Sequence, residues 1–284
     1  MKRAGYIALI GRPNSGKSTL MNAICGHKIA IVSHVPQTTR QMIKGIYTKD
    51  DDQIIFLDTP GIHESIKTYN QLLKKQAVDA LYEADAVLYV IDLARSYGRE
   101  EEGIMDLLRK AEKRVFIAFN KTDLTTPEVI QNSLAYQEII KNLPHSEVFY
   151  VSALKNKHIE ELIAGLKTIL PEQEHFYPEG TFTDQTMYFQ CAELIREQVM
   201  TRTFDEIPHA ARVEVSAIED DENLVKIHAE VLIERDSQKG ILIGEKAEKI
   251  KKIGTEARKE LEKLFHKKVF LNLQVHVDKN WRNG

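Results

Sequence analysis

The chain has 284 residues and a formal net charge of −3, with 43% hydrophobic and 29% charged residues. This length and composition suit two globular domains. The slightly negative charge excludes a chain that is basic throughout, so any nucleic-acid surface must be local. No stretch approaches the ~20 consecutive apolar residues of a membrane-spanning helix, which favours a cytoplasmic protein.

The pattern of histidine and cysteine indicates neither a metal site nor a disulfide. The ten histidines are scattered, and no spacing of His or Cys resembles a metal site. Cys25 and Cys191 fall on apolar helical stretches. We therefore expect two core thiols in a reducing compartment.

Strands and helices alternate over the first part of the chain. The hydrophobic pattern predicts strands near 6–10, 43–48, 53–57, 86–91, 115–119 and 148–151, and helices near 17–26, 68–82, 100–111, 128–142 and 158–169. Such alternation indicates a doubly wound, mostly parallel α/β sheet. The first strand accounts for the apolar run Met1–Ile10, which leads straight into a glycine-rich loop and lacks the cleavage region of an export signal.

That glycine-rich loop opens the first predicted helix. Its spacing, GxxxxGKS, is that of a loop whose backbone N–H groups surround a phosphate chain at the positive end of a helix. Lys17 is expected to reach the β and γ phosphates, and Ser18 to ligand Mg²⁺. ATPases, small-molecule kinases and GTPases share this pattern, so it does not select the base. The predicted nucleotide contacts here are Gly11, Arg12, Pro13, Asn14, Ser15, Gly16, Lys17 and Ser18.

A second segment, Asp58-Thr59-Pro60-Gly61, follows the strand 53–57. The end of this strand places the Asp58 carboxylate at the carboxyl edge of the sheet, where ligands bind. We expect Asp58 to hold Mg²⁺ through a water and the Gly61 N–H to approach the γ-phosphate. Loss of that phosphate would then release the following loop. Thr59 and Pro60 complete this predicted contact segment.

A third segment, Asn120-Lys121-Thr122-Asp123, selects the base. The Asp123 carboxylate can accept hydrogen bonds from N1–H and the exocyclic amine of guanine, whereas adenine would leave it unpaired. Lys121 can lay its alkyl stem along the base. Ser152-Ala153, just past the strand 148–151, can offer a backbone N–H to the guanine carbonyl. The three segments in this order predict a guanine-nucleotide switch.

The polar stretch 36–40 lies between the phosphate loop and Asp58. A threonine there can complete the magnesium shell, and Thr39 is favoured slightly over Thr38 because the sequence does not say which hydroxyl points inward. We interpret Arg40 as a solvated loop charge rather than an internal arginine finger. The predicted catalytic residues are Lys17, Thr39 and Gly61, and the predicted metal-binding residues are Ser18, Thr39 and Asp58.

The segments GRPNSGKS, PQTTR, DTPG, NKTD and SA occur in the order found in translation-factor-related GTPases, and the chain resembles the Era family among them. The resemblance implies GTP or GDP with Mg²⁺ at these residues. Ile62 stands where many signalling GTPases carry a catalytic glutamine, and it cannot orient water by hydrogen bonding. We therefore expect slow intrinsic hydrolysis, with the water positioned by backbone groups.

The resemblance also implies a role for Asn14 in binding a monovalent cation. Hydrolysis stimulated by K⁺ is therefore a hypothesis. The alternative for Asn14 is a turn residue that tolerates the loop geometry.

The remaining chain reads as a linker and a second domain. Prolines, a glycine and a lack of periodicity predict a first domain at 1–171, a linker at 172–183 and a second domain at 184–284. The second domain shows the order α-β-β-α-α-β, which resembles the type II (prokaryotic) KH domain, an α+β RNA-binding module. Its predicted elements are a helix at Thr186–Met200, strands at His209–Ile218 and Leu224–Ile233, two helices, and a strand at Val269–Val277.

KH modules clamp a nucleic-acid backbone on a GxxG loop between two helices. This chain has Gly244-Glu245-Lys246-Ala247 there, so Ala247 replaces the second glycine and Glu245 adds a negative charge. Residues 239–268 hold ten Lys or Arg against five Glu, whereas 181–238 hold five basic against thirteen acidic residues. This asymmetry favours RNA at one face, although charge alone also fits the solvated face of a helix. The predicted RNA contacts are Lys239, Ile243, Gly244, Glu245, Lys246, Ala247 and Lys249.

The resemblance to the Era family further implies a partner, the 3′ end of 16S ribosomal RNA, and a role in assembly of the 30S ribosomal subunit. It also implies a monomer without DNA binding and permits peripheral membrane association. Two alternatives stay open. One is a P-loop ATPase or kinase, against which Asp123 argues; the other is a GTPase whose second domain binds protein or another RNA.

Overall fold

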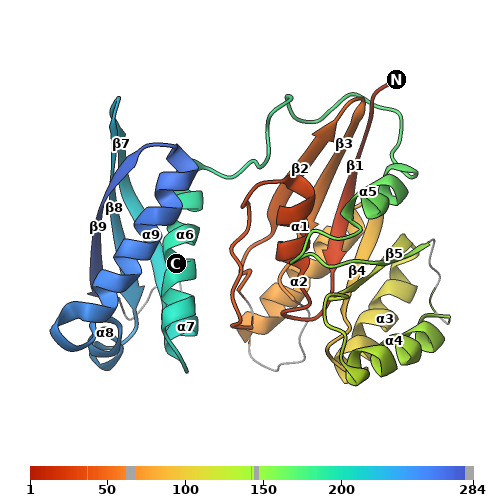
Figure 1. The fold of residues 1–284 in the computed structure, drawn as a ribbon, viewed down its shortest axis with the longest axis horizontal. Coiled ribbons are helices and arrows are strands. Elements are labelled where there is room, and N and C mark those ends of the chain that lie inside the picture. Colours follow the sequence, from red (N-terminus) through yellow and green to blue (C-terminus); the bar gives the residue numbers. More distant parts are fainter. Residues whose placement is uncertain (37, 62–67, 142, 144–146, 279–284) are drawn as a thin grey trace. The chain divides into compact units, whose positions relative to one another are not determined.

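The structure is a computed structural model, and it describes residues 1–36, 38–61, 68–141, 143 and 147–278. The chain forms two compact units (Figure 1). Residues 1–32 and 36–184 make the first unit, and the chain from Gln185 onward makes most of the second.

The first unit is built on a mixed sheet with the strand order β2-β3-β1-β4-β5-β6. β2 runs antiparallel to β3, and the other neighbours are parallel. This arrangement confirms the predicted doubly wound, mostly parallel fold. The strands are β1 (Arg3–Ile10), β2 (Ile43–Lys49), β3 (Asp52–Asp58), β4 (Ala86–Asp92), β5 (Arg114–Asn120) and β6 (Glu147–Tyr150); the helices are α1 (Lys17–Cys25), α2 (Thr68–Glu83), α3 (Arg99–Ala111), α4 (Pro127–Ile140) and α5 (Ile159–Lys167).

Helices cover both faces of this sheet. Residues of α2, α3 and α4, such as Ala80, Leu108 and Tyr136, join Tyr89 and Ile117 of the strands in one buried cluster. α1 and α5 contact each other and the sheet on the opposite face. Because both faces are covered, β3 and β4 are buried along their whole length. The parallel strands end at one edge of the sheet, where the predicted nucleotide segments begin.

The second unit is an α+β structure with the strand order β7-β8-β9. β7 and β8 are antiparallel, and β8 and β9 are parallel. A buried cluster joins the strands to α6 and α9. The elements are α6 (Met187–Arg202), α7 (Ile207–Ala210), β7 (Arg212–Asp220), β8 (Leu224–Ile233), α8 (Asp236–Ile243), the 3₁₀ turn η1 (Glu245–Ala247), α9 (Glu248–Phe265) and β9 (Lys268–Val277).

The start of the first strand in this unit was predicted wrongly. His209 lies in the short helix α7, and β7 begins only at Arg212. Pro208 occupies the first turn of α7, where its fixed φ suits a helix. The apolar residues around His209 therefore pack from a helical turn rather than from a strand.

A segment without regular secondary structure, residues 172–184, is attached to the first unit, and we call it the strap. The Ile46 N–H of β2 donates to the Phe182 carbonyl at 2.8 Å. Tyr177 exchanges two hydrogen bonds with the Gln53 side chain of β3, at 2.9 and 3.1 Å. The region predicted as a linker is thus bonded along two strands of the first unit.

The two cysteines of the chain are core residues. Cys25 and Cys191 are free and buried, and burial raises the pKa of each thiol to about 12. Both therefore behave as core residues, as expected. In the part of the chain that the structure describes, no helix has the length and apolar character needed to cross a membrane.

Candidate functional site

The phosphate loop, residues 11–16, joins the carboxyl end of β1 to the start of α1. Gly16 has φ +97°, and a Cβ there would lie 2.2 Å from Nδ2 of Asn120. Gly11 is also confined, because a Cβ would lie 2.5 Å from the carbonyl oxygen of Val90. Glycine is therefore required at both positions. The backbone of the loop leads into the N-terminus of α1, which is the arrangement that binds phosphate.

Lys17 is the buried cation of this loop. Its Nζ donates to the carbonyl oxygens of Gly11 at 3.1 Å and Arg12 at 3.0 Å. Burial lowers the pKa of Lys17 to about 8, although Asp58 nearby acts in the opposite direction. A bound phosphate chain would favour the charged ammonium, so nucleotide binding and protonation of Lys17 are linked.

Arg12 anchors the phosphate loop to the start of α3. Its guanidinium pairs with Glu100 at 2.5 Å and Glu101 at 2.8 Å. Arg95 supports the same loop by donating to the Pro13 carbonyl at 3.3 Å. Sequence analysis assigned Arg12 to the nucleotide and missed its acidic partners. Glu100 lies 88 positions away and carries no motif, so only the fold reveals the contact.

Ser18, Thr39 and Asp58 converge beside the loop. Ser18 Oγ donates to Asp58 Oδ2 at 2.6 Å and lies 3.1 Å from Thr39 Oγ1. Thr39 Oγ1 is also 3.5 Å from Asp58 Oδ2. The hydroxyl that meets Ser18 is therefore that of Thr39, the threonine slightly favoured from the sequence.

This cluster fits Mg²⁺. An octahedral Mg²⁺ with bonds of about 2.1 Å holds neighbouring oxygens about 3 Å apart, close to the separation of the two hydroxyls. Asp58 Oδ1 is buried and has no hydrogen-bond partner among the described residues. Burial raises the pKa of the Asp58 carboxyl. A cation, directly or through a water, would satisfy this orphaned oxygen.

The segment after Asp58 lies directly against the phosphate loop. Thr59 Oγ1 donates to the Leu9 carbonyl at 2.9 Å and so ties the segment to β1. A Cβ on Gly61 would lie 2.6 Å from the backbone nitrogen of Pro13. Ile62, which was predicted to be unable to orient the attacking water, lies outside the described residues.

Asn120 links the phosphate loop to the base-side loops. Its Nδ2 donates to the Ser15 carbonyl at 2.9 Å, and its Oδ1 accepts from the Ala153 N–H at 3.0 Å. The residue is only 2% exposed. Lys121 pairs with the buried Asp92 at 2.6 Å, which directs its stem across the end of the sheet.

Asp123 is held by Ser152, whose Oγ donates to Asp123 Oδ1 at 2.5 Å. Thr122 is fixed by its own N–H, which donates to the Val151 carbonyl at 3.2 Å. The Ser152 N–H donates to the Lys157 carbonyl at 3.2 Å, and that of Ala153 donates to Asn120. Both amides thus have acceptors within the protein, and their contact with the guanine carbonyl stays a prediction.

In the second unit, the predicted RNA loop connects α8 to α9. Gly244 ends α8 with φ +73°, and Lys246 and Ala247 have φ of +47° and +61°. Ala247 therefore occupies a left-handed conformation that favours glycine, at a cost of about 1 kcal/mol. Lys246 is exposed at the tip of the loop.

A hollow of about 480 Å³ lies between α9 and β9, next to the start of α9. The sequence did not predict that β9 lines this hollow, because its alternating apolar residues are typical of a core strand. Phe270 breaks that alternation and is 55% exposed, which is the signal that could have indicated a surface role for the strand. The hollow is lined by Ile250, Lys251, Gly254, Thr255, Arg258, Val269, Phe270, Leu271 and Leu273.

Comparisons with known proteins agree with both units. Residues 6–121 match the family described as 50S ribosome-binding GTPase, and residues 206–282 match the KH domain. GTPase Era of Staphylococcus haemolyticus (strain JCSC1435) is 40% identical over 282 residues, which cover 99% of this chain and 94% of the relative. The chain belongs to the Era family of GTPases. The predicted GTPase activity and KH fold are thereby confirmed.

Solved structures of the Era family are similar over nearly the whole chain. A crystal structure of Era in complex with MgGDPNP and nucleotides 1506–1542 of 16S ribosomal RNA has a TM-score of 0.91, with 36% identity over 99% of this chain and 96% of that chain. A variant of Aquifex aeolicus Era bound to GDP and AlF₄⁻ has a TM-score of 0.90, with 34% identity over 99% and 95% of the two chains.

Proposed function

We propose that this GTPase binds the 3′ end of 16S ribosomal RNA through the Gly244 loop and assists assembly of the 30S subunit. The observation that carries the proposal is the Gly244–Ala247 turn between α8 and α9, in a chain that also holds a nucleotide loop. The similar Era structure contains both a GTP analogue and that RNA segment. The proposed contacts are Lys239, Ile243, Gly244, Glu245, Lys246, Ala247 and Lys249.

In the nucleotide site, the backbone of residues 11–18 receives the phosphates and Asp123 receives the guanine base. Ser18 and Thr39 would hold Mg²⁺, with Asp58 behind them. A bound Mg²⁺ would neutralise charge on the β and γ oxygens. Lys17 supplies a second positive charge from inside the loop, and the Gly61 N–H would approach the γ-phosphate.

Slow hydrolysis with stimulation by K⁺ is part of this proposal. Asn14 has φ +63° in the phosphate loop, a conformation that turns its side chain and carbonyl away from the regular helix path. Turnover measured in potassium and in sodium buffer, with Asn14→Ala beside the unmodified protein, tests the idea. Equal rates in all four conditions would contradict it.

The strap offers a route from the nucleotide to the RNA-binding unit. β2 follows directly after the switch stretch 36–40, and its Lys44 pairs with Asp184 at the end of the strap at 3.0 Å. The His27 ring, just after α1, lies 3.5 Å from the Phe182 ring between centroids. If the bound nucleotide moves the polar stretch 36–40, the movement would therefore reach the strap through β2. The domain limits 1–171 and 184–284, with the linker 172–183, stay a proposal from the sequence.

Fluorescence anisotropy of a labelled oligonucleotide carrying the 3′ end of 16S ribosomal RNA tests the function. The protein is loaded with GDP or with a non-hydrolysable GTP analogue, at two salt concentrations. We expect tighter binding with the analogue, and weaker binding at higher salt because phosphate contacts release counterions. Lys246→Gln should weaken binding, whereas Lys259→Gln, whose lysine pairs with Glu256 at 2.8 Å, should not.

The same assay separates the alternatives. Weak binding that is equal in both nucleotide states would indicate a different RNA or a protein partner for the second unit. Lys44→Ala should abolish the nucleotide dependence of RNA binding if the strap carries the coupling. Lys2→Ala, which removes the exposed pair with Glu174, should preserve that dependence.

A cytoplasmic location with peripheral membrane association is proposed from the family resemblance, and fractionation of cells expressing the tagged chain would test it.

A further inference from the structure

Two acidic residues at the start of α3 contact the phosphate loop through one arginine. Glu101 is 2% exposed, and its Oε2 lies 2.8 Å from Nη1 of Arg12, at an angle that gives an ion pair but no hydrogen bond. Glu100 pairs with Nε of the same guanidinium at 2.5 Å. Because two nitrogens of one planar group meet two carboxylates, the direction of the arginine is fixed as well as its charge. We call this contact of Arg12 with Glu100 and Glu101 the α3 clamp.

Glu101 lies in a polar cluster inside the first unit. The hydroxyls of Tyr89 on β4 and Tyr136 on α4 are buried, and neither has a hydrogen-bond partner among the described residues. Burial, and then the charge of Glu101, raise the pKa of both hydroxyls, so both stay protonated. Burial also raises the pKa of Glu101, although Arg12 acts in the opposite direction. The Arg12 guanidinium therefore compensates a carboxylate that water scarcely reaches.

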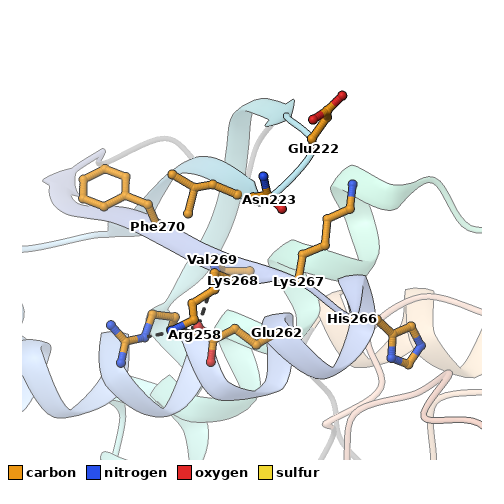
Figure 2. Close-up of a pocket in the computed structure, with 10 residues that line it drawn as sticks. Glu222, Asn223, Arg258, Glu262, His266, Lys267, Lys268, Val269 and Phe270 are labelled. Atoms are coloured by element: carbon orange, nitrogen blue, oxygen red, sulfur yellow. Dashed lines mark hydrogen bonds and ion pairs between the residues drawn. The ribbon is translucent and has the colours of Figure 1, made fainter.

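Burial distinguishes the α3 clamp from an exposed ion pair of the second unit. Arg258 and Glu262 on α9, beside a hollow of about 900 Å³, lie 4.0 Å apart, and their side chains are 50% and 35% exposed (Figure 2). Solvent screens such a pair, so breaking it costs little. The side chains of Arg12 and Glu101 are only 12% and 2% exposed. Removing one partner there leaves a buried charge without compensation, so the contact holds the loop firmly.

The clamped part of the loop contacts the groups that would serve the γ-phosphate. The Arg12 carbonyl accepts a hydrogen bond from Lys17 Nζ at 3.0 Å. The Pro13 carbonyl accepts one from Arg95 at 3.3 Å. Pro13 also packs against Gly61, since a Cβ on Gly61 would lie 2.6 Å from the Pro13 nitrogen. Residues 12 and 13 therefore connect the start of α3 to the Lys17 ammonium and to the Gly61 backbone.

We propose that Glu101 is a positioning residue for GTP hydrolysis. Through the Arg12 guanidinium it holds residues 12 and 13 where Lys17 and Gly61 act together on the γ-phosphate. GDP lacks that phosphate, so the α3 clamp serves hydrolysis and not the retention of GDP. The inference rests on the placement of Lys17 and Gly61 at the γ-phosphate that is proposed above.

Single-turnover GTP hydrolysis and GDP release, both measured on the whole protein, test this role. Glu101→Gln keeps the shape of the side chain and removes its charge. It should slow hydrolysis by about ten- to a hundred-fold, because a small displacement of reacting groups has an effect of that size, and it should leave GDP release unchanged. Glu102→Gln is the matched control, since Glu102 lies in the same turn of α3 and is exposed. Its hydrolysis rate should equal that of the unmodified protein.

A second variant approaches the α3 clamp from the loop. Arg12→Met removes the cation that Glu101 holds, so it should slow hydrolysis by a similar factor. Adding Glu101→Gln to Arg12→Met should cause no further slowing, because Glu101 acts through Arg12. Melting curves identify a temperature at which every variant is folded, and the rates are compared there.

The outcomes separate this inference from the proposed function. Hydrolysis by Glu101→Gln that is as fast as that of Glu102→Gln would overturn the positioning role. The role is also overturned if the effects of Arg12→Met and Glu101→Gln multiply, or if GDP release accelerates as much as hydrolysis slows. An unchanged rate in Gly61→Ala would instead refute the proposed placement of Gly61 at the γ-phosphate, and the positioning role with it.

Discussion

Replacing Asn120 by alanine tests whether one side chain joins the phosphate loop to the base-side loops. The change removes two hydrogen bonds, to the Ser15 carbonyl at 2.9 Å and from the Ala153 N–H at 3.0 Å. Asn120 is 2% exposed, so water does not easily replace the lost partners. Each buried group left unpaired costs about 1–3 kcal/mol, so the first unit should lose about 2–6 kcal/mol of stability.

Scanning calorimetry without nucleotide measures this loss. For a unit of this size, each 1 kcal/mol shifts the midpoint by about 2–4 °C, so the transition of the first unit should fall by about 4–24 °C. The transition of the second unit should not move. Asn132→Ala is the control, because Asn132 is partly buried and its side chain donates one bond, to the Leu93 carbonyl at 2.9 Å. A shift for Asn120→Ala no larger than that of the control would refute the reasoning.

Nucleotide dissociation gives a second readout of Asn120→Ala. Because Ser15 and Ala153 belong to loops that serve different parts of the ligand, loosening their connection should weaken the binding of the whole nucleotide. We expect the release of a fluorescent GDP derivative to become at least about ten-fold faster, which corresponds to about 1.4 kcal/mol. An unchanged release rate would mean that the loops are positioned independently.

Three further predictions concern the nucleotide site. Asp123→Asn should lower guanine-nucleotide affinity by about ten- to a hundred-fold and raise xanthine-nucleotide affinity, since one charged hydrogen bond contributes about 1.5–3 kcal/mol. Competition binding that still prefers GTP would contradict the base assignment. The pKa of Lys17 is about 8 in the free protein, and bound phosphates should raise it. Above pH 8 the complex then holds more protons than the free protein. Nucleotide affinity should therefore be constant below pH 8 and fall by up to ten-fold per pH unit above it. Titration calorimetry measures this profile, and an affinity that stays constant above pH 8 would contradict the idea. Gly61→Ala should slow hydrolysis by at least about ten-fold, because a Cβ would lie 2.6 Å from the Pro13 nitrogen; single-turnover assays check this, and an unchanged rate would remove Gly61 from the catalytic set.

Sequence reasoning worked best where the signal is local. The GxxxxGKS motif of the phosphate loop spans eight consecutive residues, 11–18, and its glycines are required by close approaches to Asn120 and Val90. The strand assignments around it were confirmed, with no strand end more than three residues from its predicted position. It failed at His209, where two competing local signals, an apolar run and Pro208, had to be weighed without tertiary packing.

The sequence by itself determined the class of nucleotide and the order of the two units, and it predicted where both binding loops lie. These properties follow from residue types at short spacings and from the position of a segment at a strand end, which the chain encodes locally. Only the tertiary structure decided that Arg12 turns to Glu100, that Asn120 joins two loops, that the strap is bonded to β2, and that a hollow lies between α9 and β9. These contacts depend on strand register and side-chain direction between distant parts of the chain, and no spacing along the sequence records them.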